Sequence, residues 1–176
     1  MSTFESYREN LKDYAKDIRL NLSNVLSPDG APGLSAKQIG TIALACAYSA
    51  RARGLVDALI SEYASTIGDA ELEAAKGAAT IMAMNNVFYR TQHHAENPEL
   101  QKLPPRLRMN VIGKPGIDKA DFELACLAVS SIGGCARCVN SHVNEVLKAG
   151  LSIEATHTAI RIAATIQAAS LAEWIS

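Results

Sequence analysis

The sequence is short of the features that mark several protein classes. Of its 176 residues only 5% are aromatic and four are cysteine, and 17 basic residues nearly balance 18 acidic ones, for a formal net charge of −1. A balanced charge excludes a strong long-range attraction to nucleic acid or anionic lipid. No apolar run approaches the roughly 18 residues that a membrane span needs. With so few cysteines, the chain is not a small scaffold held together by disulfides. From the balanced charge and the short apolar runs, we expect neither nucleic-acid binding nor membrane insertion.

The composition otherwise fits one ordinary globular domain. Hydrophobic residues make up 48% of the chain and charged residues 20%, which at this length is enough to bury a real core. We therefore expect a single domain over residues 1–176. The first residues, Met1 to Asp17, mix charged and apolar side chains in a way that is unlike a signal or transit peptide. The expected location is the cytoplasm.

The periodicity of the chain predicts an all-α fold. Alanine is abundant and no window alternates apolar and polar residues with a period of two, so no strand is expected. Ser2 and Glu5 have the spacing of a capping box. They begin a predicted helix that continues to the turn segment 27–33 and carries one apolar stripe, made of Phe4, Tyr7, Leu11, Tyr14 and Ile18.

Capping residues and glycines predict three more helices before residue 90. The first spans residues 35–53 and begins with a capping box made by Ser35 and Gln38. The second lies between Gly54 and Gly68, and the third, residues 69–89, is capped by Asp69. The following segment, residues 91–116, contains four of the six prolines. Because proline interrupts helices, we expect a long connection there, with at most one short helix near residues 106–112.

The last third of the chain predicts a helical hairpin and a long final helix. The residues that delimit them are Asp118 at the start, Gly133–Gly134 between the hairpin helices, Gly150 at the end, and Ser152 before the last helix, which runs towards Trp174. This region echoes the first half, since Ala78–Ile81 recurs as Ala163–Ile166. A duplicated helical hairpin and chance similarity between alanine-rich helices both explain the echo. Under duplication, only the second copy carries the cysteine pair.

The chemistry is expected from two cysteines, Cys135 and Cys138, in a Cys-x-x-Cys motif. Gly133–Gly134 place Cys135 at or near a helix N-terminus, where unpaired backbone N–H groups and the helix dipole favour a thiolate. Residues three and four apart share one helix face, so His142 lies beside both cysteines and can relay a proton to or from a sulfur. Arg137 projects away from that face. The pattern favours a redox-active dithiol.

Other cysteines and other uses of the pair are less consistent with the sequence. Cys46 and Cys126 lie in apolar stretches, where a thiol behaves as a small hydrophobic side chain, so we expect both to be inert. A structural zinc site needs four ligands, but only His142 offers an obvious third, and His93 and His94 lie in the proline-rich connection. A structural disulfide across so short a loop would add little stability. We expect no metal and no bound cofactor.

Several longer stretches resemble the AhpD family of alkyl hydroperoxide reductases, within the carboxymuconolactone decarboxylase-like superfamily. They are Tyr14–Ile18 (YAKDI), Gly77–Arg90 (GAATIMAMNNVFYR) and Leu107–Leu124 (LRMNVIGKPGIDKADFEL). The Cys-x-x-Cys motif alone is moderately specific, and these stretches extend the resemblance over most of the chain. Mycobacterial members carry a histidine at the position of Arg137. Because that side chain leaves the catalytic face, we expect a changed surface or electrostatic field rather than lost activity.

The resemblance implies a fold, a reaction and partners. It implies an all-helical protomer in a homotrimer, whose redox motif lies within residues 117–150 and reduces hydroperoxides. Cys138 would form the sulfenic acid and the mixed disulfide with the peroxiredoxin AhpC, while Cys135 would donate a proton and resolve that intermediate. Glu123 and His142 would complete a proton relay. Dihydrolipoamide, carried on a lipoylated 2-oxoacid dehydrogenase component and recharged by lipoamide dehydrogenase, would donate the electrons.

The identity of the attacking sulfur stays open at this point. The helix dipole favours Cys135 as the thiol with the lower pKa, whereas the resemblance assigns the first attack to Cys138. Two other functions also stay open. One is a decarboxylase acting on a muconolactone-type acid, which does not need two cysteines. The other is a non-enzymatic adaptor, either stabilised by zinc or switched by oxidation.

Overall fold

The computed structural model describes residues 3–176, and within that range it contains helices and no strand. The all-α prediction is confirmed. The capping box predicted from Ser2 and Glu5 includes a residue outside the described range. The helices are α1 (Thr3–Asn10), α2 (Lys16–Val25), α3 (Ala36–Ala50), α4 (Arg53–Glu62), α5 (Asp69–His94), α6 (Pro98–Lys102), α7 (Asn110–Gly113), α8 (Lys119–Gly133), α9 (Ala136–Lys148) and α10 (Ile153–Trp174).

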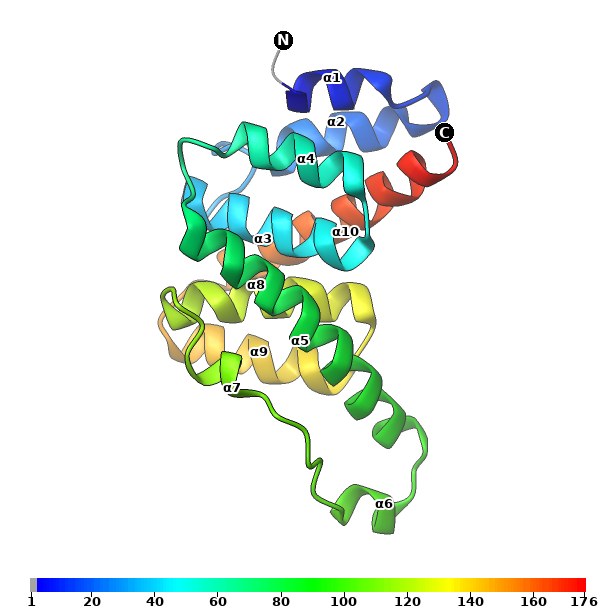
Figure 1. The fold of residues 1–176 in the computed structure, drawn as a ribbon, viewed down its shortest axis with the longest axis vertical. Helices are drawn as coiled ribbons and strands as arrows, with labels where there is room; N and C mark the ends of the chain where they lie inside the picture. The colour runs from blue at the N-terminus through cyan, green and yellow to red at the C-terminus, as the bar shows by residue number, and fades with distance from the viewer. Residues whose placement is uncertain (1–2) are drawn as a thin grey trace.

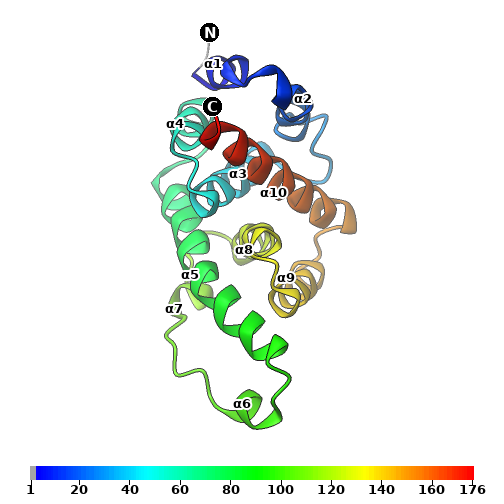
Figure 2. The same ribbon diagram turned by 90° about the vertical axis from the view of Figure 1, so that its right-hand side faces the viewer.

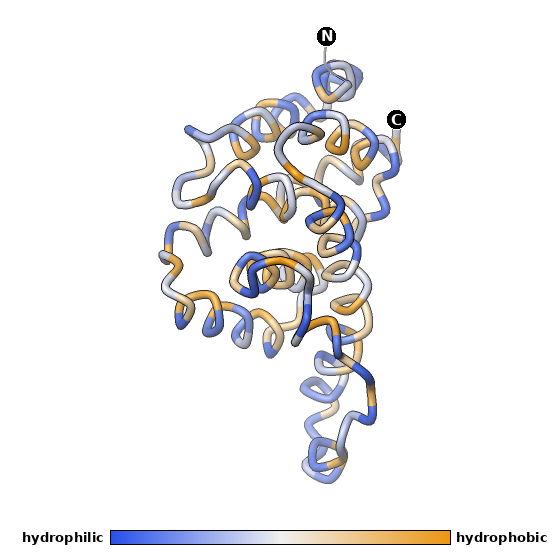
Figure 3. Tube along the Cα trace, turned by 60° about the vertical axis from the view of Figure 1, so that its left-hand side comes forward, coloured by the Kyte–Doolittle hydropathy of each residue, from blue (hydrophilic) through white to orange (hydrophobic). Residues whose placement is uncertain are grey.

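Helix α8 lies in the middle of the bundle. It packs against α3, α5, α9 and α10, and its residues 122–130 are all buried (Figures 1 and 2). Hydrophobic residues gather along the helices of the body, whereas the projecting end made by α5 and α6 is largely hydrophilic (Figure 3). Any polar side chain on the buried stretch of α8 must find its partner inside the protein. No helix in the described part of the chain is both long and apolar enough to cross a membrane.

The N-terminal apolar stripe forms two helices, so the prediction of one helix is wrong. The chain leaves the helical conformation after Asn10, and a single 3₁₀ turn, Asp13–Ala15, precedes α2. Phe4 and Leu11 are buried, but Tyr14 is 59% exposed, which interrupts the stripe. The break allows α1 to pack on α4 while α2 packs on α10. One straight helix could not follow both surfaces.

Most predicted helix ends are confirmed. The side chains of Ser35, Asp118 and Ser152 accept hydrogen bonds from backbone N–H groups in the first turns of α3, α8 and α10. Gln38 completes the capping box of α3. Gly134 ends α8 with a left-handed conformation (φ 63°), which a residue without Cβ adopts at little cost.

Several boundaries differ from the prediction. Helix α3 ends at Ala50 and not near Arg53, and α4 spans Arg53–Glu62, so Gly54 lies inside its first turn and Gly68 does not end it, because residues 63–66 form turns. The N-cap of α5 is Gly68 and not Asp69, because the Glu71 carboxylate accepts the Gly68 N–H at 2.9 Å. Helix α5 continues past Tyr89 to His94.

The proline-rich connection holds two short helices, α6 and α7, where at most one was predicted. The additional helix is α6, which Asn97 caps. Its Pro98 lies in the first turn, where a missing N–H breaks no helical hydrogen bond.

Two three-helix units repeat the same plan. In each, a 15-residue helix (α3, α8) ends in a left-handed residue, a shorter helix follows (α4, α9), and a long helix closes the unit (α5, α10). Helices α3 and α8 pack on each other and on both long helices. Aligning α3 with α8 places Ala52 opposite Cys135 and Leu59 opposite His142. This arrangement is the one that a duplication would produce, with the cysteine pair in the second unit alone.

The turn at Gly134 gives a test of the hairpin. Gly134→Ala adds a Cβ that meets no atom within 4 Å, so the cost is the left-handed backbone itself, about 1 kcal/mol of the free energy of unfolding. Urea unfolding measures it. Gly113→Ala is the matched control, because its Cβ also meets no atom within 4 Å, and it should stay within about 0.5 kcal/mol of the parent. Equal stability of the two variants would contradict this account.

Candidate active site

The cysteine pair lies where α8 ends and α9 begins. Cys135 is the N-cap of α9, as predicted, and its sulfur accepts the backbone N–H of Cys138 at 3.3 Å. The two residues are joined by a disulfide, with Cα atoms 5.3 Å apart. The left-handed Gly134 turns the chain so that the first turn of α9 faces α5. Both sulfurs therefore lie at the positive end of a helix dipole.

The two sulfurs differ in access. Cys135 is fully buried, whereas Cys138 is 6% exposed and lines a pocket of about 390 Å³ between α5, α7, α8 and α9. A nucleophile that enters this pocket meets Cys138 and not Cys135. If the disulfide opens by attack on Cys138, the electrons are left on Cys135, whose sulfur accepts a backbone N–H. Such an N-cap position stabilises a thiolate.

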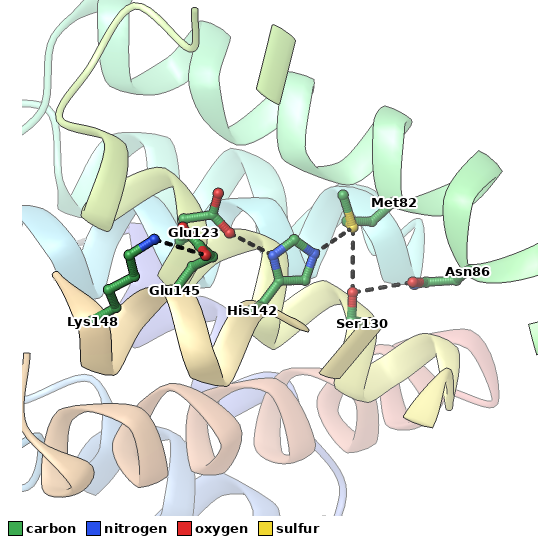
Figure 4. A network of polar contacts seen from close by, with 7 residues as sticks. All are labelled: Met82, Asn86, Glu123, Ser130, His142, Glu145 and Lys148. Atoms are coloured by element: carbon green, nitrogen blue, oxygen red, sulfur yellow. Dashed lines mark hydrogen bonds and ion pairs between the residues drawn. The ribbon is translucent and has the colours of Figure 1, made fainter. Parts of the chain in front are cut away.

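A buried carboxylate–imidazole pair adjoins the cysteines. His142 Nδ1 lies 2.6 Å from Glu123 Oε2, and the two residues are 7% and 4% exposed (Figure 4). The angle between α8 and α9, which the sequence does not give, is what brings Glu123 to His142. Because an ionised carboxylate can only accept, it favours the proton on Nδ1 and leaves Nε2 for proton exchange.

The other imidazole nitrogen meets a sulfur. His142 Nε2 lies 3.2 Å from Met82 Sδ, and the Ser130 hydroxyl lies 3.3 Å from the same sulfur and 3.1 Å from Asn86 Oδ1 (Figure 4). A thioether is a weak acceptor, so it orients the imidazole without holding a proton on Nε2 strongly. This chain of contacts ties α5, α8 and α9 together around the imidazole.

Side chains from α5 and α9 form the remaining pocket wall. The Asn85 backbone carbonyl oxygen lies 3.9 Å from Cys138 Sγ, and Asn85 is one of the residues that line the pocket. The Arg137 guanidinium stacks over the Tyr89 ring, 4.8 Å from its centroid. The prediction that Arg137 leaves the catalytic face is confirmed, but its place in the pocket wall was not predicted. Arg137 leaves the face shared by Cys135, Cys138 and His142, but its long side chain turns back to line the same pocket.

Comparison with known proteins agrees with this geometry. The chain is 47% identical over 162 residues to the alkyl hydroperoxide reductase AhpD of Coxiella burnetii (strain RSA 493 / Nine Mile phase I), covering 92% of each protein. It is 46% identical to the AhpD of Rhodospirillum centenum, over 94% of this chain and 88% of the relative. It belongs to the AhpD family. The model of the carboxymuconolactone decarboxylase family matches residues 98–175, so the predicted resemblance is confirmed at both levels.

Several residues of this AhpD-family site were missed from the sequence. Met82, Asn85, Asn86 and Ser130 have no special spacing to the cysteines along the chain, and only the packing of α5 against α8 and α9 brings them there. One signal was present. Two consecutive asparagines lie in the middle of the alanine-rich α5, and burying their polar side chains costs free energy unless hydrogen-bond partners compensate for it.

The remaining thiols and histidines lie away from the pocket. Cys46 and Cys126 are fully buried, and burial raises the pKa of both thiols well above the usual range. The nearby Glu123 charge raises the pKa of Cys126 further. His93 and His94 form the exposed last turn of α5. Within residues 3–176, no three His, Cys, Asp or Glu side chains gather so that they could hold a metal ion.

Thiol labelling tests these environments. In the reduced native protein at neutral pH, iodoacetamide should modify Cys138 first and Cys46 and Cys126 at least ~100-fold more slowly, because burial keeps the last two as inaccessible thiols. Peptide mass spectrometry over time gives the rates. Unreduced protein should stay unlabelled, and denatured, reduced protein should label at all four cysteines. Labelling of Cys46 or Cys126 as fast as Cys138 would contradict the assignment.

Proposed function

We propose that this protein is an antioxidant, thiol-dependent alkyl hydroperoxide reductase that takes electrons from dihydrolipoamide. It delivers them to hydroperoxides and to the disulfide of the peroxiredoxin AhpC. The single observation that carries the proposal is a disulfide with only Cys138 open to a pocket, beside the buried Glu123–His142 pair. Relatives that bear the name alkyl hydroperoxide reductase AhpD, matched over 92% and 88% of their length, support it. The site of action would be the cytoplasm.

The reductive half-reaction begins at the accessible sulfur. A thiolate of dihydrolipoamide attacks Cys138 Sγ, the bond to Cys135 breaks, and the electron pair stays on Cys135, where the Cys138 N–H stabilises it. The second thiol of the donor then displaces Cys138. The products are oxidised lipoamide and a reduced Cys135–Cys138 dithiol. No bound cofactor takes part.

The oxidative half-reaction uses the same sulfur as nucleophile. The Cys138 thiolate attacks the terminal oxygen of a hydroperoxide, the O–O bond breaks, and Cys138 becomes a sulfenic acid while an alkoxide leaves. Cys135 then attacks Cys138 Sγ, water leaves, and the disulfide forms again. With AhpC, Cys138 attacks the disulfide of the partner, and Cys135 resolves the mixed disulfide in the same way.

Protons for both steps would come from the buried pair. His142 Nε2 can protonate the departing alkoxide, and the Glu123 carboxylate stabilises the imidazolium before that transfer. His142 is held by Glu123 on one side and by Met82 on the other, so its ring has one defined orientation beside the pocket. A positioned acid of this kind typically contributes a factor of about 10² to 10⁴.

The shape of the pocket supports the proposed partners. A volume of about 390 Å³ admits an extended arm such as a lipoyl chain or a cysteine-bearing segment, but not a folded domain. The lipoyl group of a 2-oxoacid dehydrogenase component, kept reduced by lipoamide dehydrogenase, fits this requirement. The basic Lys119 and Arg137 and the acidic Glu123 and Glu145 all line the pocket, whereas the neighbouring residues 100–117 contain four basic and no acidic side chains. A partner with an acidic surface would be favoured.

A homotrimer, the assembly implied by the family resemblance, is part of the proposal. The end of α5, helix α6 and residues 103–109 project beyond the body (Figures 1 and 2). Tyr89 and Met109 on this arm also line the pocket. A second copy packed on the arm would border the site and cover its exposed apolar residues, which are Val87, Leu100, Leu103 and Leu107.

A coupled assay tests the proposal. NADH oxidation is followed with lipoamide dehydrogenase, lipoamide and an alkyl hydroperoxide, with and without a peroxiredoxin. The Cys135→Ser/Cys138→Ser variant should fall to the background rate, because it has no dithiol to oxidise, while Cys46→Ala should retain the parent rate. Turnover retained by the double variant would contradict the redox assignment. A rate that rises strongly with peroxiredoxin would identify AhpC as the principal acceptor.

A further inference from the structure

Asn85 carries an unsatisfied polar atom and lines the same pocket as the reacting sulfur. The residue is 4% exposed, and its Oδ1 atom is buried with no hydrogen-bond partner. Its backbone carbonyl oxygen lies 3.9 Å from Cys138 Sγ, and Asn85 is one of the residues that line the pocket. The adjacent Asn86 is equally buried, but it accepts from Ser130 and donates to the Val129 carbonyl. Of these two asparagines, only the one on the pocket lacks a partner.

A buried amide without a partner needs an explanation. Leaving such a group unpaired costs stability, whereas an apolar side chain of similar shape would be nearly neutral at the same position. An unpaired acceptor on a residue that lines a binding pocket can acquire its partner when a ligand brings a donor. The structure thus points to a ligand with a hydrogen-bond donor at the atoms nearest Cys138.

The position of Asn85 distinguishes between the two ligands of the proposed reaction. In dihydrolipoamide the carboxamide N–H is separated from the thiols by several carbon atoms, so it would lie far from Cys138 when a thiol reacts there. A hydroperoxide carries its only O–H on the terminal oxygen, which is the atom that Cys138 attacks. The dihydrolipoamide sulfur attacks as a thiolate, without its S–H, so the donor and the reacting atom coincide only in the hydroperoxide.

We propose that Asn85 is a substrate-binding residue for the hydroperoxide group, an inference that rests on the proposed function. Its Oδ1 accepts the O–H of the substrate and holds the terminal oxygen against Cys138 Sγ. The thiolate attacks that oxygen, the O–O bond breaks, the hydrogen stays on the new sulfenic acid, and His142 protonates the departing alkoxide. Asn85 thereby selects hydrogen peroxide and monoalkyl hydroperoxides over dialkyl peroxides, which have no O–H.

Single-turnover kinetics with Asn85→Leu test this role. Three rate constants are measured: oxidation of the reduced protein by tert-butyl hydroperoxide, alkylation of Cys138 by iodoacetamide, and reduction of the disulfide by dihydrolipoamide. Loss of one hydrogen bond to the substrate should slow the first about tenfold. The other two should stay within about twofold, because neither reagent offers a donor at the reacting atom that resembles the hydroperoxide O–H. The variant should unfold at no lower a temperature than the parent.

Control variants make each outcome decisive. Asn144→Leu carries the same exchange at an exposed position of α9 and should leave all three rates unchanged. Asn85→Ala should repeat the selective loss if the leucine variant folds poorly. Equal slowing of all three rates, or no change in the first, would overturn the inference while leaving the proposed function intact. A parent protein that hydroperoxide does not oxidise would instead contradict the proposed function, and the inference with it.

Discussion

The buried contact between Glu123 and His142 is the interaction on which the rest of the site depends. A carboxylate inside a protein is stable only when it is paired and hydrogen-bonded, so the helices that carry the pair must meet at one angle. Helix α8 supplies Glu123 from a stretch that is buried on every side, and α9 supplies His142 one turn after Cys138. The left-handed turn at Gly134 fixes the hairpin that joins them. Because α9 begins directly after this turn, Cys135 and Cys138 lie at its start.

This geometry gives the two sulfurs complementary properties. Cys135 has the electrostatic advantage of the N-cap position but no access to solvent, while Cys138 has access to the pocket. A stabilised, buried sulfur is a good leaving group, and an accessible sulfur is the one that reagents reach. Thiolate stabilisation at Cys135 and first attack at Cys138 are therefore compatible, because they concern different steps of the proposed cycle.

Local signals in the sequence were sufficient for much of the fold. Ser35, Asp118 and Ser152 act through their own neighbouring N–H groups, and the cysteine pair and His142 share a face through helical spacing alone. The break after Asn10 could not be predicted in this way, because it follows from the packing of α1 on α4 and α2 on α10.

Long-range packing explains what was missed at the site. The contact of Glu123 with His142 depends on a hairpin angle, and Met82 and Asn85 come from a helix far away in the sequence. The contact of Arg137 with Tyr89 in the pocket wall could not be predicted from its helical position, which does not describe where a long side chain ends. The family resemblance included the segment that carries Met82 and Asn85, but it gave them no role.

The central claim is that Cys138 is the sulfur that reacts and Cys135 is the sulfur that resolves. The most direct test is to reduce the Cys135→Ser variant, add one equivalent of alkyl hydroperoxide in the presence of dimedone, and locate the adduct by peptide mass spectrometry. The account predicts a stoichiometric adduct on Cys138, with little or none on Cys135 in the converse Cys138→Ser variant. The account would be contradicted if the Cys138→Ser variant formed a stoichiometric adduct on Cys135 while the Cys135→Ser variant formed none on Cys138.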